Sequence, residues 1–417
     1  WLLDWIWIWI LDTATDLAFY ASAEKLSFTN YTLYKILPEN VQQITLLQQL
    51  EGDANYDFWT DPVPSAKFVN IMSTPQQKSN LESFLSRNEI KFEVAIENVQ
   101  DAMDKETVTP YNRIGINNMR WDTYYTLEDV EAWMTDVVIA YPSIVTPVVG
   151  GVTYEGREIK GLKITHGGEK RVIFIEAGIH SREWIVVSFA CYLINELVTS
   201  TDSETMAAAR DFEWYIFPVT NPDGYVWTHS TDRLWRKNRR PIDNTNYGVD
   251  LNRNWNNNWL GASINPSTQT YAGPGPFSEP ETRSLSTFIR SIGDKIDIYL
   301  SFHSAGQLLL IPFGNSTEQY ANYDEVKVGR RAMGALATRF GTQYVTGNIA
   351  EAIYEASGGS IDWVKEQLKV PLVYCYELRD RGVYGHLLPT DQILPNNLEA
   401  MDSVIEMIHQ AKRFGVI

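Results

Sequence analysis

Cysteine is scarce in this chain, and the two that occur, Cys191 and Cys375, both lie in apolar runs. Two cysteines are too few for a disulfide scaffold, although they do not exclude secretion. A long apolar run is also missing, because Asp4 interrupts the Trp- and Ile-rich residues 1–10 and no basic residue precedes them. This stretch therefore fits neither a signal peptide nor a membrane-spanning helix. An aromatic strand and a wrongly assigned stretch of sequence stay open, and we assign no function to residues 1–29.

The chain also has fewer basic than acidic residues. Its 35 Lys and Arg residues and 52 Asp and Glu residues give a formal net charge of −17. Nucleic acid and anionic membrane surfaces bind basic proteins, so this charge argues against both as partners. Of the 417 residues, 44% are hydrophobic, which is typical of a folded soluble protein. This length predicts a large core with a second, smaller module.

Residues 30–99 predict a small independent domain. Extended segments are expected at 31–37, 57–59, 67–72 and 90–96, and a helix is expected after the first and the third. Thr74, followed by Pro75 and Gln77, predicts a capped start for the second helix. The order strand–helix–strand–strand–helix–strand is that of a ferredoxin-like α+β domain.

A polar linker is expected at residues 100–120, where no apolar stripe is evident. It carries two basic residues, Arg113 and Arg120. An ordinary connection between domains and an activation segment cut by a protease are both compatible with this pattern.

From residue 121 to residue 417, buried strands alternate with helices. Strands are expected at 171–177, 212–219, 296–302 and 370–378, and helices at 183–198 and 397–414. Ser278 and Glu281 predict a capped start for a further helix. This alternation predicts an α/β fold with a mostly parallel sheet and helices on both faces. Functional sites in such folds form beyond the carboxyl ends of the strands.

Three of these predicted strands end in groups suited to metal binding and acid–base chemistry. The first is followed by His180 and Glu183, another by His303, and the last contains Glu377. Two imidazoles and one carboxylate are the ligand set of a catalytic zinc ion with an open position for water. Zinc makes such a water acidic, and a second carboxylate such as Glu377 can move its proton. Each residue alone is weak evidence, because a lone histidine or a strand-end glutamate is more often structural.

Seven motifs in order along residues 121–417 resemble the pancreatic-type zinc metallocarboxypeptidases of the A/B family. The motifs are Gly178–Ile185, Asn221–Tyr225, Leu234–Lys237, Asn252–Trp255, Ser301–Ser304, Ile353–Ser360 and Glu377–Asp380. The resemblance implies a mixed, mostly parallel eight-stranded sheet flanked by helices. It also implies that residues 30–99 are an inhibitory pro-domain of the ferredoxin-like type.

The resemblance assigns roles to individual residues. It implies that His180, Glu183 and His303 hold one zinc ion and that Glu377 is general base and then general acid. It further implies roles for five residues around the substrate. Arg236 would stabilise the oxyanion, and Asn252 and Arg253 would bind the terminal carboxylate. Tyr354 would close over the bound end of the peptide, and Arg182 would contact the residue upstream of it.

The expected specificity pocket ends at Ile361, where relatives that remove Lys or Arg carry Asp. An apolar residue there leaves a buried cation unpaired. With Ile349, Ala356 and Gly314 at the other matched positions, the resemblance implies an A-type preference for aliphatic and aromatic C-terminal residues.

Four features depart from the family pattern. The cysteines are not placed for the usual pancreatic disulfide, and Ala305 stands where A-type pancreatic members have Tyr. His386 replaces Phe, and Cys375 replaces Thr near the pocket. The upstream subsite is therefore less well defined than the catalytic residues.

The resemblance implies a secreted, digestive zymogen that acts on peptides with a free C-terminus. Its pro-domain would inhibit it until a trypsin-like protease cuts after Arg113, or alternatively after Arg120, and a monomer is expected. Two alternatives are a catalytically silent binding protein with this fold and a zinc amidohydrolase acting on small acylated amino acids. The first is disfavoured because no catalytic part is lost, and the second because it would lack the pro-domain and the pocket segment.

Overall fold

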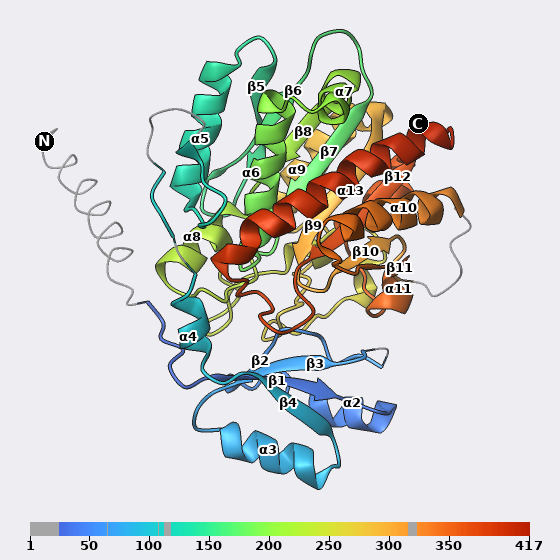
Figure 1. Cartoon of the computed structure of the whole chain (residues 1–417). Coiled ribbons are helices and arrows are strands. Elements are labelled where there is room, and N and C mark those ends of the chain that lie inside the picture. Colours follow the sequence, from blue (N-terminus) through green and yellow to red (C-terminus); the bar gives the residue numbers. More distant parts are fainter. Residues whose placement is uncertain (1–24, 65, 107, 112–117, 316–322) are drawn as a thin grey trace, which may run out of the picture.

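A computed structural model describes residues 25–417 apart from 65, 107, 112–117 and 316–322. The described chain forms two domains with separate hydrophobic cores. In Figure 1 the small N-terminal domain lies against one end of the large domain. The Trp-rich residues 1–10 lie outside the described part of the chain.

The small domain is an antiparallel sheet with two helices on the face away from the large domain (Figure 1). Its elements are β1 (Thr32–Leu37), α2 (Val41–Gln48), β2 (Tyr56–Phe58), β3 (Val69–Ser73), α3 (Lys78–Arg87) and β4 (Lys91–Ile96). The strand order β2-β3-β1-β4 confirms the expected ferredoxin-like arrangement. Tyr34 and Ile36 of β1 share a core with Leu47 of α2 and Leu81 of α3.

The large domain contains an eight-stranded mixed sheet in the order β11-β10-β12-β9-β7-β8-β6-β5. Its strands are β5 (Val145–Val152), β6 (Glu158–Ile164), β7 (Val172–Ala177), β8 (Glu213–Phe217), β9 (Ile296–Ser304), β10 (Leu308–Ile311), β11 (Val345–Asn348) and β12 (Leu372–Leu378). The central strands β12, β9, β7 and β8 are parallel, and antiparallel pairs occur on both sides of them. The predicted fold class is therefore confirmed.

Helices cover both faces of this sheet, as the buried strands require. The described α-helices outside the small domain are α4 (Val99–Met103), α5 (Leu127–Ala140), α6 (Trp184–Thr199), α7 (Ser203–Asp211), α8 (Pro222–Ser230), α9 (Pro280–Ile292), α10 (Tyr323–Phe340), α11 (Ile349–Ala352), α12 (Ser360–Leu368) and α13 (Ile393–Arg413). One core packs α5, α6, α10 and α13 against the sheet, and a second packs α9 and α12 against its other face. Among the described helices none by itself is long and apolar enough to span a membrane, and only the bent pair α6–α7 reaches that length and composition together.

Both predicted capping motifs are wrong. Helix α3 begins at Lys78, and the hydroxyl of Thr74 instead donates to the side-chain oxygen of Asn55 at 3.3 Å. Helix α9 has Glu279 as its N-cap, and the Ser278 hydroxyl donates to the carboxylate of Glu279 at 2.7 Å. In each case the hydroxyl has a partner outside the helix, so it does not cap the free N–H groups.

The parallel register brings three chain segments to one edge of the sheet. Glu377 of β12 lies opposite His303 of β9, and β9 in turn pairs with β7, which leads into His180. The loop before α12 closes this edge, since Gly358 accepts from the N–H of Trp255 and donates to the carbonyl of Asn257. The site therefore depends on the order of strands that are far apart in the sequence.

Gly358 has a φ of +73°, and a Cβ at this position would overlap the carbonyl oxygen of Arg253. We expect Gly358→Ala to lower the free energy of unfolding by about 2 kcal/mol or more, through left-handed strain and overpacking. Gly359→Ala is the matched control, because the nearest atom to its new Cβ would be 3.6 Å away. Denaturant unfolding followed by tryptophan fluorescence measures the free energy of unfolding of both variants. Equal losses of stability would contradict the strain that we expect at position 358.

Candidate active site

Three potential metal ligands meet at the edge of the sheet. His180 and Glu183 lie in the turn between β7 and α6, and His303 lies near the end of β9. The two Nδ1 atoms are 3.0 Å apart, and each is close to the Glu183 carboxylate, at 3.0 Å from His180 and 3.3 Å from His303. Their ligand atoms all lie within 4.8 Å of one another, and all three residues are buried.

The outer nitrogens of the two imidazoles are held by polar groups. Nε2 of His180 lies 3.2 Å from Asp250, a carboxylate that accepts its proton in a hydrogen bond, and Nε2 of His303 lies 3.0 Å from the Ser301 hydroxyl. With its proton on Nε2, His180 presents an Nδ1 lone pair to the triad. Two such nitrogens and a carboxylate converging on one point repel one another unless a cation lies between them. This donor set fits Zn²⁺, which prefers imidazole and carboxylate ligands of this kind.

The electrostatics of the triad also favour a cation. Burial alone would raise the pKa of Glu183, but His180 and His303 outweigh it and hold this pKa well below its usual range. Burial lowers the pKa of His180, and the nearby charge of Arg236 lowers it further. Burial would also lower the pKa of His303, but its hydrogen bond to Glu183 and the charge of that carboxylate outweigh burial and raise it.

Two charged side chains face the same space as the triad. Burial raises the pKa of Glu377 to about 8, so this carboxyl can hold or release a proton near neutral pH. Arg236 donates through Nη2 to Asp250 at 2.8 Å, and its Nη1 lies 3.8 Å from Glu183. The site thus places a proton-transfer group and a fixed cation beside the metal position.

A second cluster lies next to the triad and is suited to bind a carboxylate. The side chain of Arg253 donates to the hydroxyl of Tyr354 at 2.8 Å, and the Asn252 side chain accepts from the Ser360 N–H at 2.9 Å. Ser360 opens helix α12, so this helix fixes the position of Asn252. A guanidinium and an amide held side by side match the two oxygens of a carboxylate.

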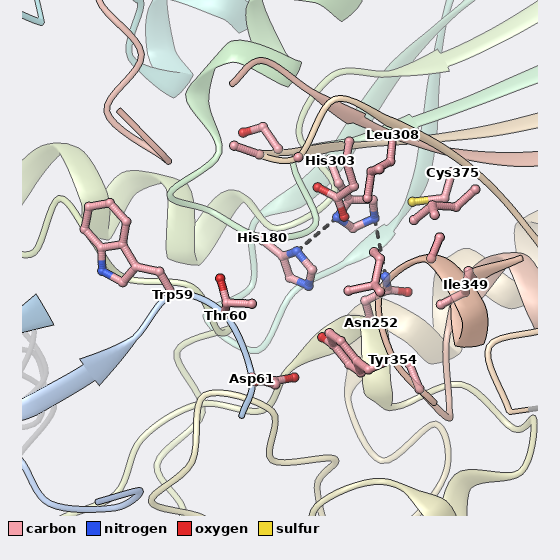
Figure 2. Close-up of a pocket in the computed structure, with 18 of the residues that line it drawn as sticks. Trp59, Thr60, Asp61, His180, Asn252, His303, Leu308, Ile349, Tyr354 and Cys375 are labelled. Atoms are coloured by element: carbon pink, nitrogen blue, oxygen red, sulfur yellow. Dashed lines mark hydrogen bonds between the residues drawn. The ribbon is translucent and has the colours of Figure 1, made fainter. Parts of the chain in front are cut away.

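One cavity of about 410 Å³ connects these groups. The structure brings thirteen predicted site residues to its wall: His180, Arg182, Glu183, Arg236, Asn252, Arg253, His303, Gly314, Ile349, Tyr354, Ala356, Ile361 and Glu377. Ala305, Cys375 and His386, which depart from the family pattern, line it as well. Figure 2 shows Leu308, Ile349 and Cys375 together beside His303, away from Trp59.

The small domain forms the opposite wall of the cavity. Asp57 lies 3.5 Å from Arg182, and Asp61 lies 3.8 Å from Arg253 (Figure 2 shows Asp61 near Tyr354). The Trp59 ring packs on the imidazole of His386, with 5.3 Å between ring centres. The small domain therefore occupies the entrance with aromatic and acidic side chains.

The segment after α4 is also attached to the large domain. The Glu106 side chain is buried and accepts two hydrogen bonds of 2.6 Å from the Arg233 guanidinium, which lies over the Trp184 ring. Of the two predicted cleavage sites, Arg113 lies outside the described residues, and Arg120 is exposed and paired with Asp122.

Sequence reasoning missed Asp250, which binds both His180 and Arg236. It also missed the small-domain acids Asp57 and Asp61. Asp250 lies two residues before Asn252, so its proximity to a predicted site residue was the available signal. No sequence signal shows which acidic residues of one domain face the arginines of another.

Comparisons with known proteins agree with this geometry. A model of zinc carboxypeptidases matches residues 130–403, and a model of the carboxypeptidase activation peptide matches residues 34–106. Zinc carboxypeptidase A 1 of Drosophila melanogaster is 40% identical, covering 94% of this chain and 95% of that protein. A zinc carboxypeptidase of Simulium vittatum is 48% identical over 70% of this chain and 98% of its own length. The crystal structure of carboxypeptidase A from Helicoverpa armigera has a TM-score of 0.82 and 28% identity, covering 94% of this chain and 99% of that one.

Asp250 should control how tightly the site holds zinc. Asp250→Asn replaces the carboxylate that accepts from His180, and we expect zinc affinity to fall by about tenfold to a hundredfold. Competition with a chromophoric chelator measures this affinity without an activity assay. Asp243→Asn is the control, since Asp243 is an exposed loop residue whose change should leave zinc affinity unaltered. Equal affinities of the two variants would contradict this role.

Proposed function

Because this chain belongs to the zinc carboxypeptidase family and carries an activation peptide, we propose that it is the secreted precursor of an A-type enzyme. The proposed enzyme removes aliphatic and aromatic residues from peptide C-termini. The observation that carries this proposal is that Ile361, Ile349 and Ala356 line the same cavity as the Asn252–Arg253 pair. The relative from Drosophila melanogaster is named zinc carboxypeptidase A 1, a name that agrees with the proposed type.

The residues of the site divide the reaction between them. Asn252 and Arg253 bind the terminal carboxylate of the peptide, and Tyr354 covers it. This grip places the last peptide bond beside the triad, which limits cleavage to one residue at a time. When zinc is bound by His180, Glu183 and His303, it supplies Lewis-acid chemistry that activates water and polarises the scissile carbonyl.

Proton transfer and charge stabilisation fall to two further side chains. Glu377 takes a proton from the attacking water and delivers it to the leaving amine, since its carboxyl lines the same cavity as the triad. Arg236, fixed by Asp250, directs its guanidinium at the negative charge that develops on the carbonyl oxygen. A silent binding protein would not need this complete set.

The activation peptide inhibits by occupying the substrate path. Its Asp61 approaches Arg253, the residue that would bind the substrate carboxylate, and its Asp57 approaches Arg182. Burial, and then the charge of Asp61, raises the pKa of Tyr354, so that hydroxyl stays protonated. A cut by a trypsin-like protease after Arg113, or after Arg120, would separate this domain from a monomeric enzyme that acts in a digestive lumen.

Limited trypsin treatment tests both the zymogen and its specificity. We expect one bound zinc per chain, low activity before cleavage, and at least a tenfold rise after it. Activity is measured with blocked dipeptides ending in Phe, Leu, Lys or Glu, and Phe and Leu should be released fastest. The variants Arg113→Gln and Arg120→Gln identify the cut. Activity that trypsin leaves unchanged would refute the zymogen, whereas fastest release of Lys would refute the A-type pocket.

The end of the pocket should determine the side chain that is released. Ile361→Asp places a carboxylate where a Lys or Arg side chain would end, so preference should shift toward these residues by about tenfold or more. Ile353→Asp is the comparison variant and should not cause this shift, because Ile361 and not Ile353 is the position that matches the end of the family's pocket. The ratio of kcat/KM for C-terminal Lys and Phe after activation measures the shift. An unchanged ratio would contradict the placement of Ile361.

A further inference from the structure

A buried carboxylate that the proposed mechanism does not use lies behind the metal triad. Glu176 belongs to β7, is fully buried, and lies opposite Ser301 in the parallel pairing of β7 with β9. Although the chain continues from β7 to His180, the hydrogen bonds of Glu176 lead to the other imidazole of the triad, that of His303.

Three hydroxyl groups donate to this carboxylate. Tyr299 donates to Oε2, and Ser301 and Ser360 donate to Oε1 at 3.3 Å and 3.4 Å. Burial raises the pKa of Glu176, whereas these three hydrogen bonds and the charge of His303 favour its ionised form. A cation in the triad would favour the ionised form further, because it adds positive charge beside His303. An ionised carboxylate only accepts, so each hydroxyl directs its proton at Glu176.

This direction decides which nitrogen of His303 carries the proton. The Ser301 oxygen lies 3.0 Å from Nε2 of His303 and, with its own proton directed at Glu176, can only accept there. Nε2 therefore carries the proton, and Nδ1 presents its lone pair to the triad. The Asn252 amide nitrogen, a donor 3.3 Å from the same Nε2, favours the opposite tautomer (Figure 2), so the Nε2 proton depends on the pair of Ser301 and Glu176.

The arrangement is the counterpart of the one at His180. There Asp250 lies 3.2 Å from Nε2 and accepts directly, whereas at His303 a serine hydroxyl stands between the imidazole and the carboxylate. A histidine that binds a metal almost always donates its other N–H to a polar group, which fixes the ring and raises the basicity of the ligand nitrogen. The carboxylate behind Ser301 strengthens that acceptor, because it polarises the hydroxyl.

We propose that Glu176 is a positioning residue of the zinc site, which acts through Ser301 to hold the Nε2 proton and the ring orientation of His303. It is not a catalytic residue, because Ser301 stands between it and the metal ligand. The inference concerns how zinc is held and does not depend on which C-terminal residue the enzyme releases. Its failure would therefore leave the proposed specificity untouched.

The zinc affinity of the uncleaved precursor is the direct test. Glu176→Gln keeps the size of the side chain but replaces an acceptor with a group that also donates, so Ser301 no longer has to direct its proton away from His303. We expect zinc affinity to fall by about tenfold to a hundredfold in competition with a chromophoric chelator. Glu281→Gln is the matched control, because Glu281 is also buried in the large domain but accepts from the N–H of Tyr154. Equal affinities of the two variants would overturn the proposal.

A double-mutant cycle shows whether the effect passes through Ser301. Ser301→Ala removes the oxygen that accepts from His303, and we expect it to lower zinc affinity by a similar factor. Adding Glu176→Gln to Ser301→Ala should then change the affinity by less than about twofold, because the connection is already broken. Losses that multiply independently would overturn the assigned route.

A spectroscopic measurement separates positioning from a loss of stability. Co²⁺ bound in place of zinc absorbs visible light, and its bands depend on the orientation and basicity of its ligands. We expect Glu176→Gln and the smaller change Ser301→Ala to shift these bands. Tyr299→Phe removes the donor to the other oxygen of Glu176, so it should lower the free energy of unfolding without moving the bands. Bands that neither Glu176→Gln nor Ser301→Ala shifts would overturn the proposal.

Discussion

The carboxylate of Asp250 holds together two parts of the site that have different tasks. It accepts from His180, a ligand of the metal triad, and from Arg236, the cation beside that triad. His180 and Asp250 are buried and the Arg236 side chain is 11% exposed, so each charge needs its partner. A shift of Asp250 would therefore disturb His180 of the metal triad and the guanidinium of Arg236 together. This explains why the loop before Leu251 must keep its conformation.

Acidic side chains of the small domain lie near arginines of the large domain. The substrate path contains two buried arginines, Arg182 and Arg253, which in the free enzyme would face solvent or a substrate carboxylate. In the precursor, Asp57 and Asp61 of the activation peptide lie near them. In the proposed function, the positive charge that would recognise a C-terminus thus also contacts acids of the activation peptide. Separation of the domains would then expose this charge to substrate.

The specificity pocket combines a fixed frame with local variation. Helix α12 begins with Ser360, whose N–H fixes Asn252, and continues with Ile361 and Asp362 at the pocket wall. One turn of helix therefore positions the carboxylate-binding amide, the apolar end of the pocket and a buried acid. Cys375, which lies on strand β12, contributes to the lining of the same cavity.

The sequence by itself determined the two-domain order, the alternation of strands and helices, and the family motifs, because periodicity and short motifs are local properties of the chain. It failed at Thr74 and Ser278, whose hydroxyls have partners that no local pattern reveals. Only the tertiary structure decided which acids face which arginines, as Asp57 and Asp61 do at Arg182 and Arg253. These facts depend on the order of parallel strands and on the docking of one domain against the other, which place residues far apart in sequence within a few ångströms.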